Sequence, residues 1–182
     1  MTSSDFDLLA NAANFIKEDL KKENAAWEGS PFEWVLRLPP GSKGKLGKQL
    51  VLQWCALKEL AVDKSPDSDA DMLINGHRVE VKFSTLWEKG YYKFQQIRDQ
   101  DYEYSICLGI SPFDVHCWVI SKIILKNHVI RHLGQHTGSK GQETAWFPVN
   151  PMNPPEWLTS CGGTLEKAFS VLKPLSTRKK QI

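Results

Sequence analysis

The 182-residue sequence lacks any apolar run near the roughly 20 residues that a membrane-spanning helix needs. Its N-terminus also lacks the charged start, apolar centre and small-residue cleavage site of a signal peptide. Cysteine is scarce, and Cys55, Cys107, Cys117 and Cys161 form no Cys-x-x-Cys pair, which argues against a zinc ribbon and against a disulfide framework. These absences predict a cytoplasmic protein with buried free thiols and no membrane contact.

A nucleotide-binding phosphate loop is absent as well. The glycine- and lysine-rich stretch around Gly47-Lys48 fails that pattern because Gln49 stands where Ser or Thr is required. No internal repeat and no low-complexity segment occurs. We therefore expect no nucleotide cofactor and, given 41% hydrophobic and 24% charged residues, a single globular domain over residues 1–182.

Net charge is small, at +2, but it is unevenly distributed. Residues 1–40 carry four Lys/Arg against seven Asp/Glu, whereas residues 104–182 carry nine against four. A polyanion would be attracted to the C-terminal third of the chain. Scatter over that length could give the same bias, so charge alone leaves the partner open.

The strongest local signal is Asn75-Gly76, which lies between two apolar-rich runs and is typical of a two-residue hairpin turn. Counting outward from the turn pairs Ile74 with His77, Met72 with Val79, Asp71 with Glu80 and Asp69 with Lys82. Alternation then puts the apolar side chains on one face, Ala70, Met72, Ile74, Val79, Val81 and Phe83. The charged side chains share the other face.

Directly opposed carboxylates at Asp71 and Glu80 would repel each other and destabilise the hairpin. A bound divalent cation or the Lys82 ammonium group would offset the repulsion. Carboxylate oxygens suit Mg²⁺, which keeps several of its waters and is often held by one or two carboxylates. The hairpin therefore predicts a magnesium site on its charged face. A solvated face of surface ion pairs is the alternative.

This arrangement resembles the PD-(D/E)xK nuclease superfamily, in which an Asp on one strand faces an acidic-x-Lys element on the next. Here that element reads Glu80-Val81-Lys82, and strand register favours Asp71 as its partner. The literal Pro-Asp dipeptide is Pro66-Asp67, so Asp67 and Asp69 stay open as alternatives.

The resemblance covers roughly residues 42–120 and implies a restriction-endonuclease-like α/β (α+β) fold, a mixed β-sheet core flanked by helices. It also implies that Asp71 and Glu80 hold Mg²⁺, with the Val81 carbonyl as a further ligand. Lys82 would orient or activate the attacking water.

Two helices are expected before the hairpin. Residues 5–20 place Phe6, Leu9, Ala13 and Ile16 at steps of three and four, as in an amphipathic helix. A second helix opens at residues 42–48, with Leu46, Leu50, Trp54, Leu57 and Ala61 as its apolar stripe.

The entry to the second helix contains Lys43, Lys45 and Lys48, which could contact DNA phosphates. Its Lys-Gly-x-x-Gly pattern resembles the helix entry of the methyl-directed mismatch-repair nicking endonuclease and its restriction-enzyme relatives. Those relatives carry an acidic residue inside the helix, whereas Glu59, near the far end, is the only acid here. No third carboxylate is therefore assigned, and a glycine-rich turn with solvated lysines remains the alternative.

After the hairpin, residues 91–100 are expected to form a short helix, and Gln95, Gln96 and Arg98 are candidate DNA contacts. Residues 104–110 and 115–120 alternate as two antiparallel strands, and residues 164–173 form a final helix.

His128, His132 and His136 recur every four residues, which on a helix would suggest zinc. Gly134 and the glycine-rich residues 137–141 argue against such a helix. We instead expect a donor-rich loop for phosphates or base edges, with a plain surface loop as the alternative. Its candidate contacts are Arg131, His132, Gln135, His136, Ser139, Lys140 and Gln142.

These features predict a Mg²⁺-dependent endonuclease that cuts double-stranded DNA, as a type II restriction enzyme does. Residues 1–41 would form a helix and connector, residues 42–120 the catalytic core, and residues 121–182 the recognition and C-terminal elements. Because one hairpin can cut only one strand at a time, we expect a homodimer. The alternatives are a nicking or DNA-repair endonuclease with the same site, and a DNA-binding protein without catalysis.

Overall fold

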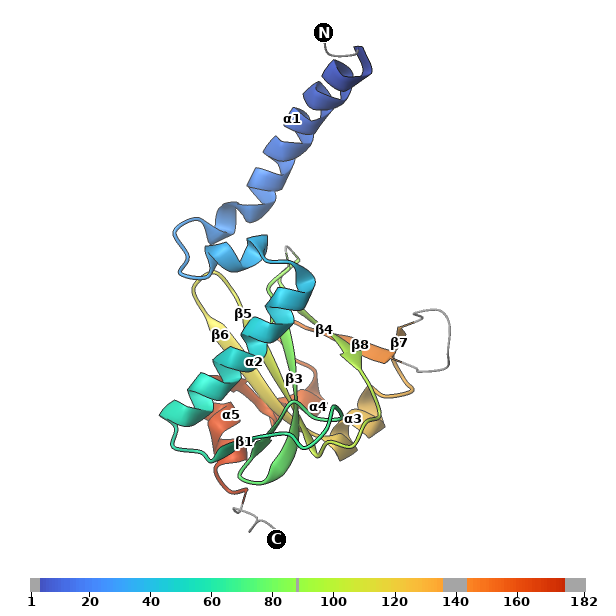
Figure 1. The fold of residues 1–182 in the computed structure, drawn as a ribbon. Coiled ribbons are helices and arrows are strands. Elements are labelled where there is room, and N and C mark those ends of the chain that lie inside the picture. The colour runs from blue at the N-terminus through green and yellow to red at the C-terminus, as the bar shows by residue number, and fades with distance from the viewer. Residues whose placement is uncertain (1–3, 88, 136–143, 176–182) are drawn as a thin grey trace.

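The centre of the computed structural model, which describes residues 4–87, 89–135 and 144–175, is a six-stranded mixed sheet (Figure 1). Its strand order is β1-β2-β3-β5-β6-β9. The strands are β1 (Val62–Lys64), β2 (Met72–Ile74), β3 (His77–Thr85), β5 (Tyr104–Ile110), β6 (Val115–Ser121) and β9 (Gly162–Thr164). The pair β3 and β5 is parallel, and the other neighbours are antiparallel.

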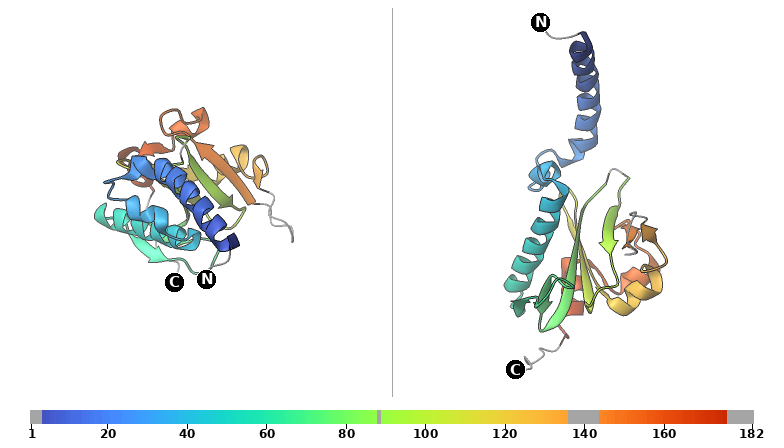
Figure 2. Two further views of the ribbon diagram at one scale, coloured as in Figure 1. Left: turned by 90° about the horizontal axis from the view of Figure 1, so that it is seen from above. Right: turned by 45° about the vertical axis from the view of Figure 1, so that its right-hand side comes forward.

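A second sheet, ordered β4-β8-β7, lies against the first. It is formed by β4 (Tyr92–Ile97), β7 (Gly134–Gln135) and β8 (Thr144–Val149). The helices are α1 (Ser4–Asn24), η1 (Ala25–Trp27), η2 (Glu33–Arg37), α2 (Pro40–Leu57), α3 (Lys122–His128), α4 (Glu156–Thr159) and α5 (Leu165–Leu172). Helices α2 and α5 cover one face of the large sheet, and the small sheet lies on the other (Figures 1 and 2). The expected mixed sheet flanked by helices is confirmed.

The β2–β3 hairpin has the expected turn and, between Met72 and Val79, the expected register. Asn75 and Gly76 both have positive φ, 51° and 81°, as a two-residue turn of this hand requires. Met72 pairs with Val79 and Ile74 with His77. Met72, Ile74, Val79 and Val81 are buried against α2 and α5, as alternation predicts. Ala70, expected on the same face, lies instead in the core on the other side of the sheet, because β2 begins only at Met72.

Helix α2 contacts the sheet through small side chains. Gly47, Val51 and Cys55 are buried one turn apart, whereas Leu57 is exposed. The buried face of α2 therefore differs from the expected stripe of Leu46, Leu50, Trp54, Leu57 and Ala61. Leu46, Leu50 and Trp54 are only partly buried beside the line of Gly47, Val51 and Cys55. The helix ends at Leu57, so Ala61 lies outside it. The reason is steric, because an added Cβ at Gly47 would lie 2.7 Å from Cγ of Phe83 on β3.

Strands β5 and β6 form the most buried part of the sheet, and both were expected from the sequence. One face of the pair contributes Ile106 and Leu108 to the core under α2 and α5. The opposite face contributes Trp118 and Ile120 to a second core, shared with Phe94 of β4 and Phe147 of β8.

The expected helix at residues 91–100 was wrong, because this segment contains strand β4. Tyr92 and Phe94 alternate as buried residues, but Gln96 has φ 56° and the register with β8 shifts between Phe94 and Ile97. This irregularity places Ile97 three residues after Phe94, a spacing that resembles a helical period.

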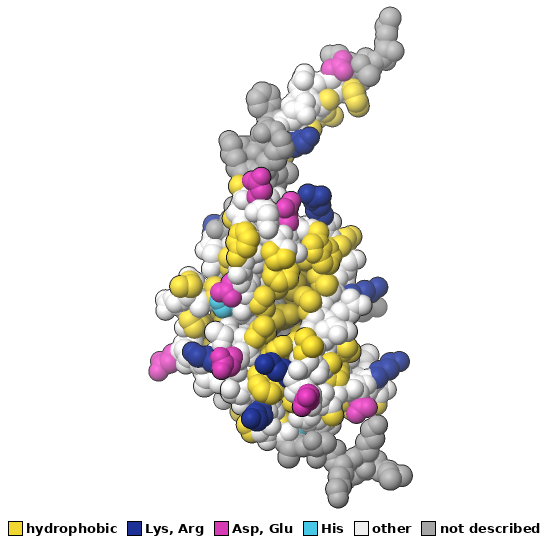
Figure 3. Space-filling view, turned by 90° about the vertical axis from the view of Figure 1, so that its left-hand side faces the viewer, with side chains coloured by type: hydrophobic (Ala, Val, Ile, Leu, Met, Phe, Trp, Pro, Cys, Tyr) yellow, Lys and Arg dark blue, Asp and Glu magenta, His cyan; other side chains and the backbone are white. Residues whose placement is uncertain are grey.

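The N-terminal segment joins the body through η1 and η2, where Trp27, Val35 and Ile110 form a small core. Helix α1 extends away from the two sheets (Figures 1 and 2). Its Phe6, Leu8, Leu9 and Ile16 side chains are each more than half exposed. Hydrophobic side chains also gather on the face of the body shown in Figure 3.

The C-terminal helix was expected correctly, and α5 begins at Leu165 with Thr164 as its N-cap. The four cysteines are free and buried, also as expected. None of the helices among the described residues is long and apolar enough to cross a bilayer.

Candidate active site

The charged face of the hairpin lies beside an open edge of β3. Strand β2 pairs with residues 77–79 only, whereas β5 pairs with β3 as far as Thr85. Residues 80–85 therefore have a strand neighbour on one side alone. Lys82 and its neighbours on this edge line a groove whose walls come from α2 and β4.

Asp71 closes the start of that open edge. Its Oδ2 accepts a hydrogen bond of 2.8 Å from the Val81 N–H, and its own N–H donates to the Val79 carbonyl at 2.9 Å. Because Met72 is also paired with Val79, two residues lie opposite one, as in a β-bulge. Asp71 is thus not directly opposite Glu80, and the expected pairing of Asp69 with Lys82 does not form, because β2 starts only at Met72.

Glu80 and Lys82 lie two residues apart on the same face of β3. The Lys82 Nζ donates to Glu80 Oε1 at 2.6 Å and to the Gln96 carbonyl of β4 at 2.8 Å. Their side chains are only 13% and 14% exposed. Burial raises the pKa of the Glu80 carboxyl; the Lys82 ammonium opposes this shift, and the Asp71 carboxylate adds to it.

Lys48 of α2 forms an ion pair with Asp71 Oδ1. The Lys48 side chain is 48% exposed, whereas the Asp71 side chain is only 10% exposed. The sequence indicated Lys48 as a DNA contact, and the structure places it against a candidate metal ligand. Each carboxylate of the site therefore has a lysine of its own.

The groove has a volume of about 580 Å³. Its lining contains four lysines, Lys43, Lys48, Lys82 and Lys93, and one carboxylate, Glu80. Because the cations outnumber the carboxylate, the groove attracts an anion. Gln95 and Gln96 lie on its β4 side, so with Lys43 and Lys48 the structure brings four of the predicted DNA contacts to the predicted catalytic residues.

The two other candidate acids lie in different surroundings. Asp67 pairs with Arg78 at 2.5 Å, and hydrogen bonds from Arg78 and from the Asp69 N–H lower the pKa of the Asp67 carboxyl. Asp69 accepts a long hydrogen bond of 3.5 Å from Gln100. Asp71, by contrast, accepts the hydrogen bond of the Val81 N–H, between Glu80 and Lys82, and this contact favours Asp71.

The residues present have the chemistry of a magnesium site. Carboxylate oxygens come from Asp71 and Glu80, and the Val81 carbonyl points to the same strand edge as the Val81 N–H that Asp71 binds. Such an oxygen-only set suits Mg²⁺, with water filling the remaining positions. Within the described part of the chain, no three His, Cys, Asp or Glu side chains cluster as metal ligands, so a cation here would depend on two carboxylates.

Other predicted contacts lie away from the groove. Lys45 is exposed but does not line it, and Arg98, which follows β4, does not line it either. Arg131 is exposed and has a positive φ of 68°. Its Nη2 lies 3.9 Å from Asp99 Oδ2, and Asp99 Oδ1 also pairs with the Lys122 Nζ at 3.0 Å.

The expected recognition loop falls largely outside the described residues. His136, Ser139, Lys140 and Gln142 lie there, and for Gln135 only the backbone, in β7, is described. His132 is exposed, and α3 ends at His128, whose ring stacks on Trp157 with centroids 5.1 Å apart. Consequently, His128 and His132 do not share a helical stripe.

Sequence reasoning missed two residues of the groove wall. Trp87, after β3, and Lys93, on β4, both line it, and the Lys93 Nζ lies 5.4 Å from the Trp87 ring centroid. The sequence from Trp87 to Phe94 is rich in aromatic and cationic residues, which could have indicated a binding surface. Because a helix was expected over residues 91–100, the alternation of buried and exposed side chains along β4 was not recognised.

Comparisons with known proteins give little further information. No family model matches the sequence, and no curated protein matches it. Among solved structures, a chain described as the bacterial homing endonuclease I-Ssp6803I is similar, with a TM-score of 0.48 and 16% sequence identity. The alignment covers 74% of this chain and 92% of that chain.

Proposed function

We propose that this protein is a Mg²⁺-dependent endonuclease that hydrolyses phosphodiester bonds of double-stranded DNA, as a type II restriction enzyme does. The observation that carries the proposal is the convergence of Asp71, Glu80 and Lys82 at the open edge of β3. A groove lined by four lysines runs past this point and offers a path for a phosphate backbone.

Each residue has a role that its contacts support. Asp71 and Glu80 would hold the cation together with the Val81 carbonyl. Bound Mg²⁺ supplies a Lewis acid and lowers the pKa of a bound water. Lys82 is held by Glu80 and by the Gln96 carbonyl, so its ammonium group is fixed where it can orient an attacking water and add positive charge near the phosphate.

The test is a cleavage assay on plasmid and phage DNA, followed by sequencing of the ends. We expect cutting with Mg²⁺ and none with EDTA. Asp71→Asn and Glu80→Gln keep the shape of the side chains but remove the negative charge. We expect each to lower the cleavage rate by more than about 100-fold, the scale for losing one pre-organised electrostatic contact, and to retain DNA binding in Ca²⁺.

Asp67→Asn and Asp69→Asn are matched controls from the same segment and should keep most of the activity. If Asp71→Asn cuts normally and one of the controls is inactive, the wrong acid has been assigned. Cutting of one strand only would favour a nicking or repair enzyme with the same residues.

One observation favours a second candidate, a DNA-binding protein without catalysis. Both carboxylates are already ion-paired, Asp71 with Lys48 and Glu80 with Lys82, so the cluster is neutralised without a metal. Calorimetric titration of the protein with Mg²⁺ or Mn²⁺ separates the two. Metal binding that Asp71→Asn abolishes supports the nuclease, and DNA binding with no metal binding supports the second candidate.

A further inference from the structure

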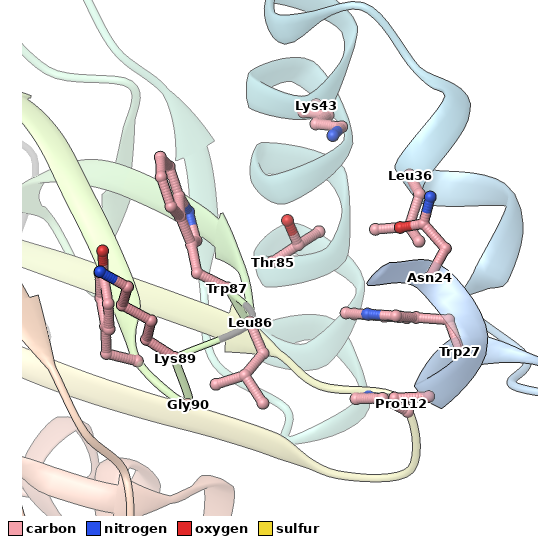
Figure 4. Close-up of a pocket in the computed structure, with 12 residues that line it drawn as sticks. Asn24, Trp27, Leu36, Lys43, Thr85, Leu86, Trp87, Lys89, Gly90 and Pro112 are labelled. Atoms are coloured by element: carbon pink, nitrogen blue, oxygen red, sulfur yellow. The ribbon is translucent and has the colours of Figure 1, made fainter. Parts of the chain in front are cut away.

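A second cavity adjoins the catalytic groove and has a different chemical character. Its volume is about 620 Å³, within the range typical of ligand pockets. It lies between the N-terminal segment and the connection from β3 to β4. Figure 4 shows Trp87 and Lys89 on one side, with Asn24 and Trp27 on the other.

The two cavities share a wall. Lys43, Thr85 and Trp87 line both the aromatic pocket, as we call this second cavity, and the catalytic groove. A ligand in the aromatic pocket would therefore be the direct neighbour of a polyanion in the groove.

The lining of the aromatic pocket suits an aromatic ring attached to an anion. Trp87 and Tyr91 supply aromatic side chains, and Lys43 and Lys89 add positive charge. None of the described residues that line the pocket is acidic. A nucleotide combines these features, since its base stacks on aromatic side chains and its phosphate attracts ammonium groups.

Trp87 is held in position although its side chain is 47% exposed. Its ring stacks on the Tyr91 ring, with ring centroids 5.9 Å apart and an interplanar angle of 21°. The backbone N–H of Trp87 donates to the Tyr91 carbonyl at 3.0 Å, and the backbone N–H of Gly90 donates to the Trp87 carbonyl at 2.8 Å. The stacking surface is thus formed before any ligand arrives.

We propose that the aromatic pocket binds one unpaired nucleobase of the nucleic acid that lies in the catalytic groove, with Trp87 as the stacking platform. The inference rests on the proposed function, because it takes the groove as the path of the phosphate backbone. Two sources supply this chemistry: a single strand, and a base extruded from a duplex.

The experiment measures binding of the full-length protein in EDTA, where no probe is cut. Three fluorescent probes of one sequence are compared by anisotropy: a single strand, a duplex with one bulged adenine, and a fully paired duplex. Trp87→Ala should weaken binding of at least one probe with an unpaired base by about 5- to 150-fold, the scale of one stacked base. Binding of the paired duplex should change much less.

Trp34→Ala is the matched control, because Trp34 is 52% exposed and does not line the pocket. It should bind all three probes as the wild type does. Trp87→Phe keeps a smaller ring and should have intermediate affinity. A loss confined to the bulged duplex identifies an extruded base as the ligand, and a loss confined to the single strand identifies single-stranded nucleic acid.

A photocrosslink gives a second readout. With 5-iodouracil at the unpaired position, the crosslinked peptide should contain Trp87 or Tyr91. Equal affinity of Trp87→Ala and wild type for all three probes would overturn the proposal, as would crosslinks that map only elsewhere. Because cleavage is not involved, a protein that never cuts DNA but shows these losses would refute the nuclease and keep the pocket.

Discussion

His116 on β6 is a partly buried histidine outside the candidate active site. Its Nδ1 lies 2.8 Å from the Tyr92 hydroxyl, and its Nε2 lies 3.6 Å from the Asp114 carboxylate. Burial lowers the pKa of the imidazole below its ordinary value, and Asp114 partly opposes this shift. Folding therefore favours the neutral form of His116.

We predict that this histidine makes stability depend on pH. The unfolded chain takes up the proton near the ordinary pKa of about 6.5, before the folded chain does, so acidification through that value favours unfolding. The free energy of unfolding should therefore fall between pH 7.5 and pH 5.5, by at most about 1.4 kcal/mol per pH unit for one proton. Urea unfolding at a series of pH values measures it.

His116→Asn is the variant that isolates the effect. Its amide oxygen can still accept from the Tyr92 hydroxyl, and it cannot titrate in this range. The variant should show a smaller slope of stability against pH than the wild type, whatever its stability at pH 7.5. Equal slopes would show that His116 is not the group responsible.

Lys48 shows how a single residue can differ in role from what its sequence context indicates. Lys43, Lys45 and Lys48 all lie in the first half of α2. Of these three, Lys48 pairs with Asp71, and Lys45 does not line the groove. The difference follows from the packing of Gly47, which brings this part of α2 onto β3. The sequence showed the cluster of charge but not which of its members meets the carboxylate.

At the scale of elements, the contact between α2 and β3 depends on Gly47. We predict that Gly47→Ala destabilises the protein, because the added methyl group would overlap Phe83. Overpacking of this kind costs about 1–3 kcal/mol, against a gain of up to about 1 kcal/mol in helix propensity. The midpoint of thermal unfolding should fall by a few °C.

Gly44→Ala is the control, since it lies in the same helix and an added Cβ there meets nothing within 4 Å. It should raise the midpoint through helix propensity alone. If the two variants shift the midpoint in the same direction, close packing at Gly47 does not set the position of α2.

The elements that the sequence predicted correctly depend on local signals. Asn75-Gly76 determines both the turn and the register of the β2–β3 hairpin, so Glu80 and Lys82 could be assigned to one face without further information. Strands β5 and β6 are joined by a short connection and are apolar nearly throughout. For these elements, local preference and tertiary packing agree.

Strand β4 could not be predicted in the same way. Its partner β8 is about 50 residues further along the chain, and its alternation is interrupted at Gln96. Trp87 and Lys93 reach the groove only because β4 lies beside β3, so they could not be assigned from spacing. The residues of the site that lie in the hairpin were predictable, and those brought by packing were not.

The whole molecule presents apolar surface that its own fold does not cover. Helix α1 has 21 residues and would be about 30 Å long, yet it extends from the body with Phe6, Leu8, Leu9 and Ile16 exposed (Figures 1 and 2). Isolated helices of this length are marginal in water, so most of their stability must come from packing. Trp27 of η1, which follows α1 directly, is by contrast buried in the chain's own core.

We propose that α1 packs against a second copy of the chain. The described residues contain one candidate catalytic hairpin, and an enzyme that cuts both strands of a duplex in one encounter needs two such sites, related by a two-fold axis when the DNA site is palindromic. We predict a dimer in sedimentation velocity at micromolar concentration, and a monomer for the double variant Phe6→Glu with Leu9→Glu.

Leu57→Glu is the control, because Leu57 is exposed at the far end of α2 and its substitution should leave the dimer intact. A wild-type protein that sediments as a monomer, both free and bound to duplex DNA in Ca²⁺, would contradict the dimer and require the strands to be cut one after the other.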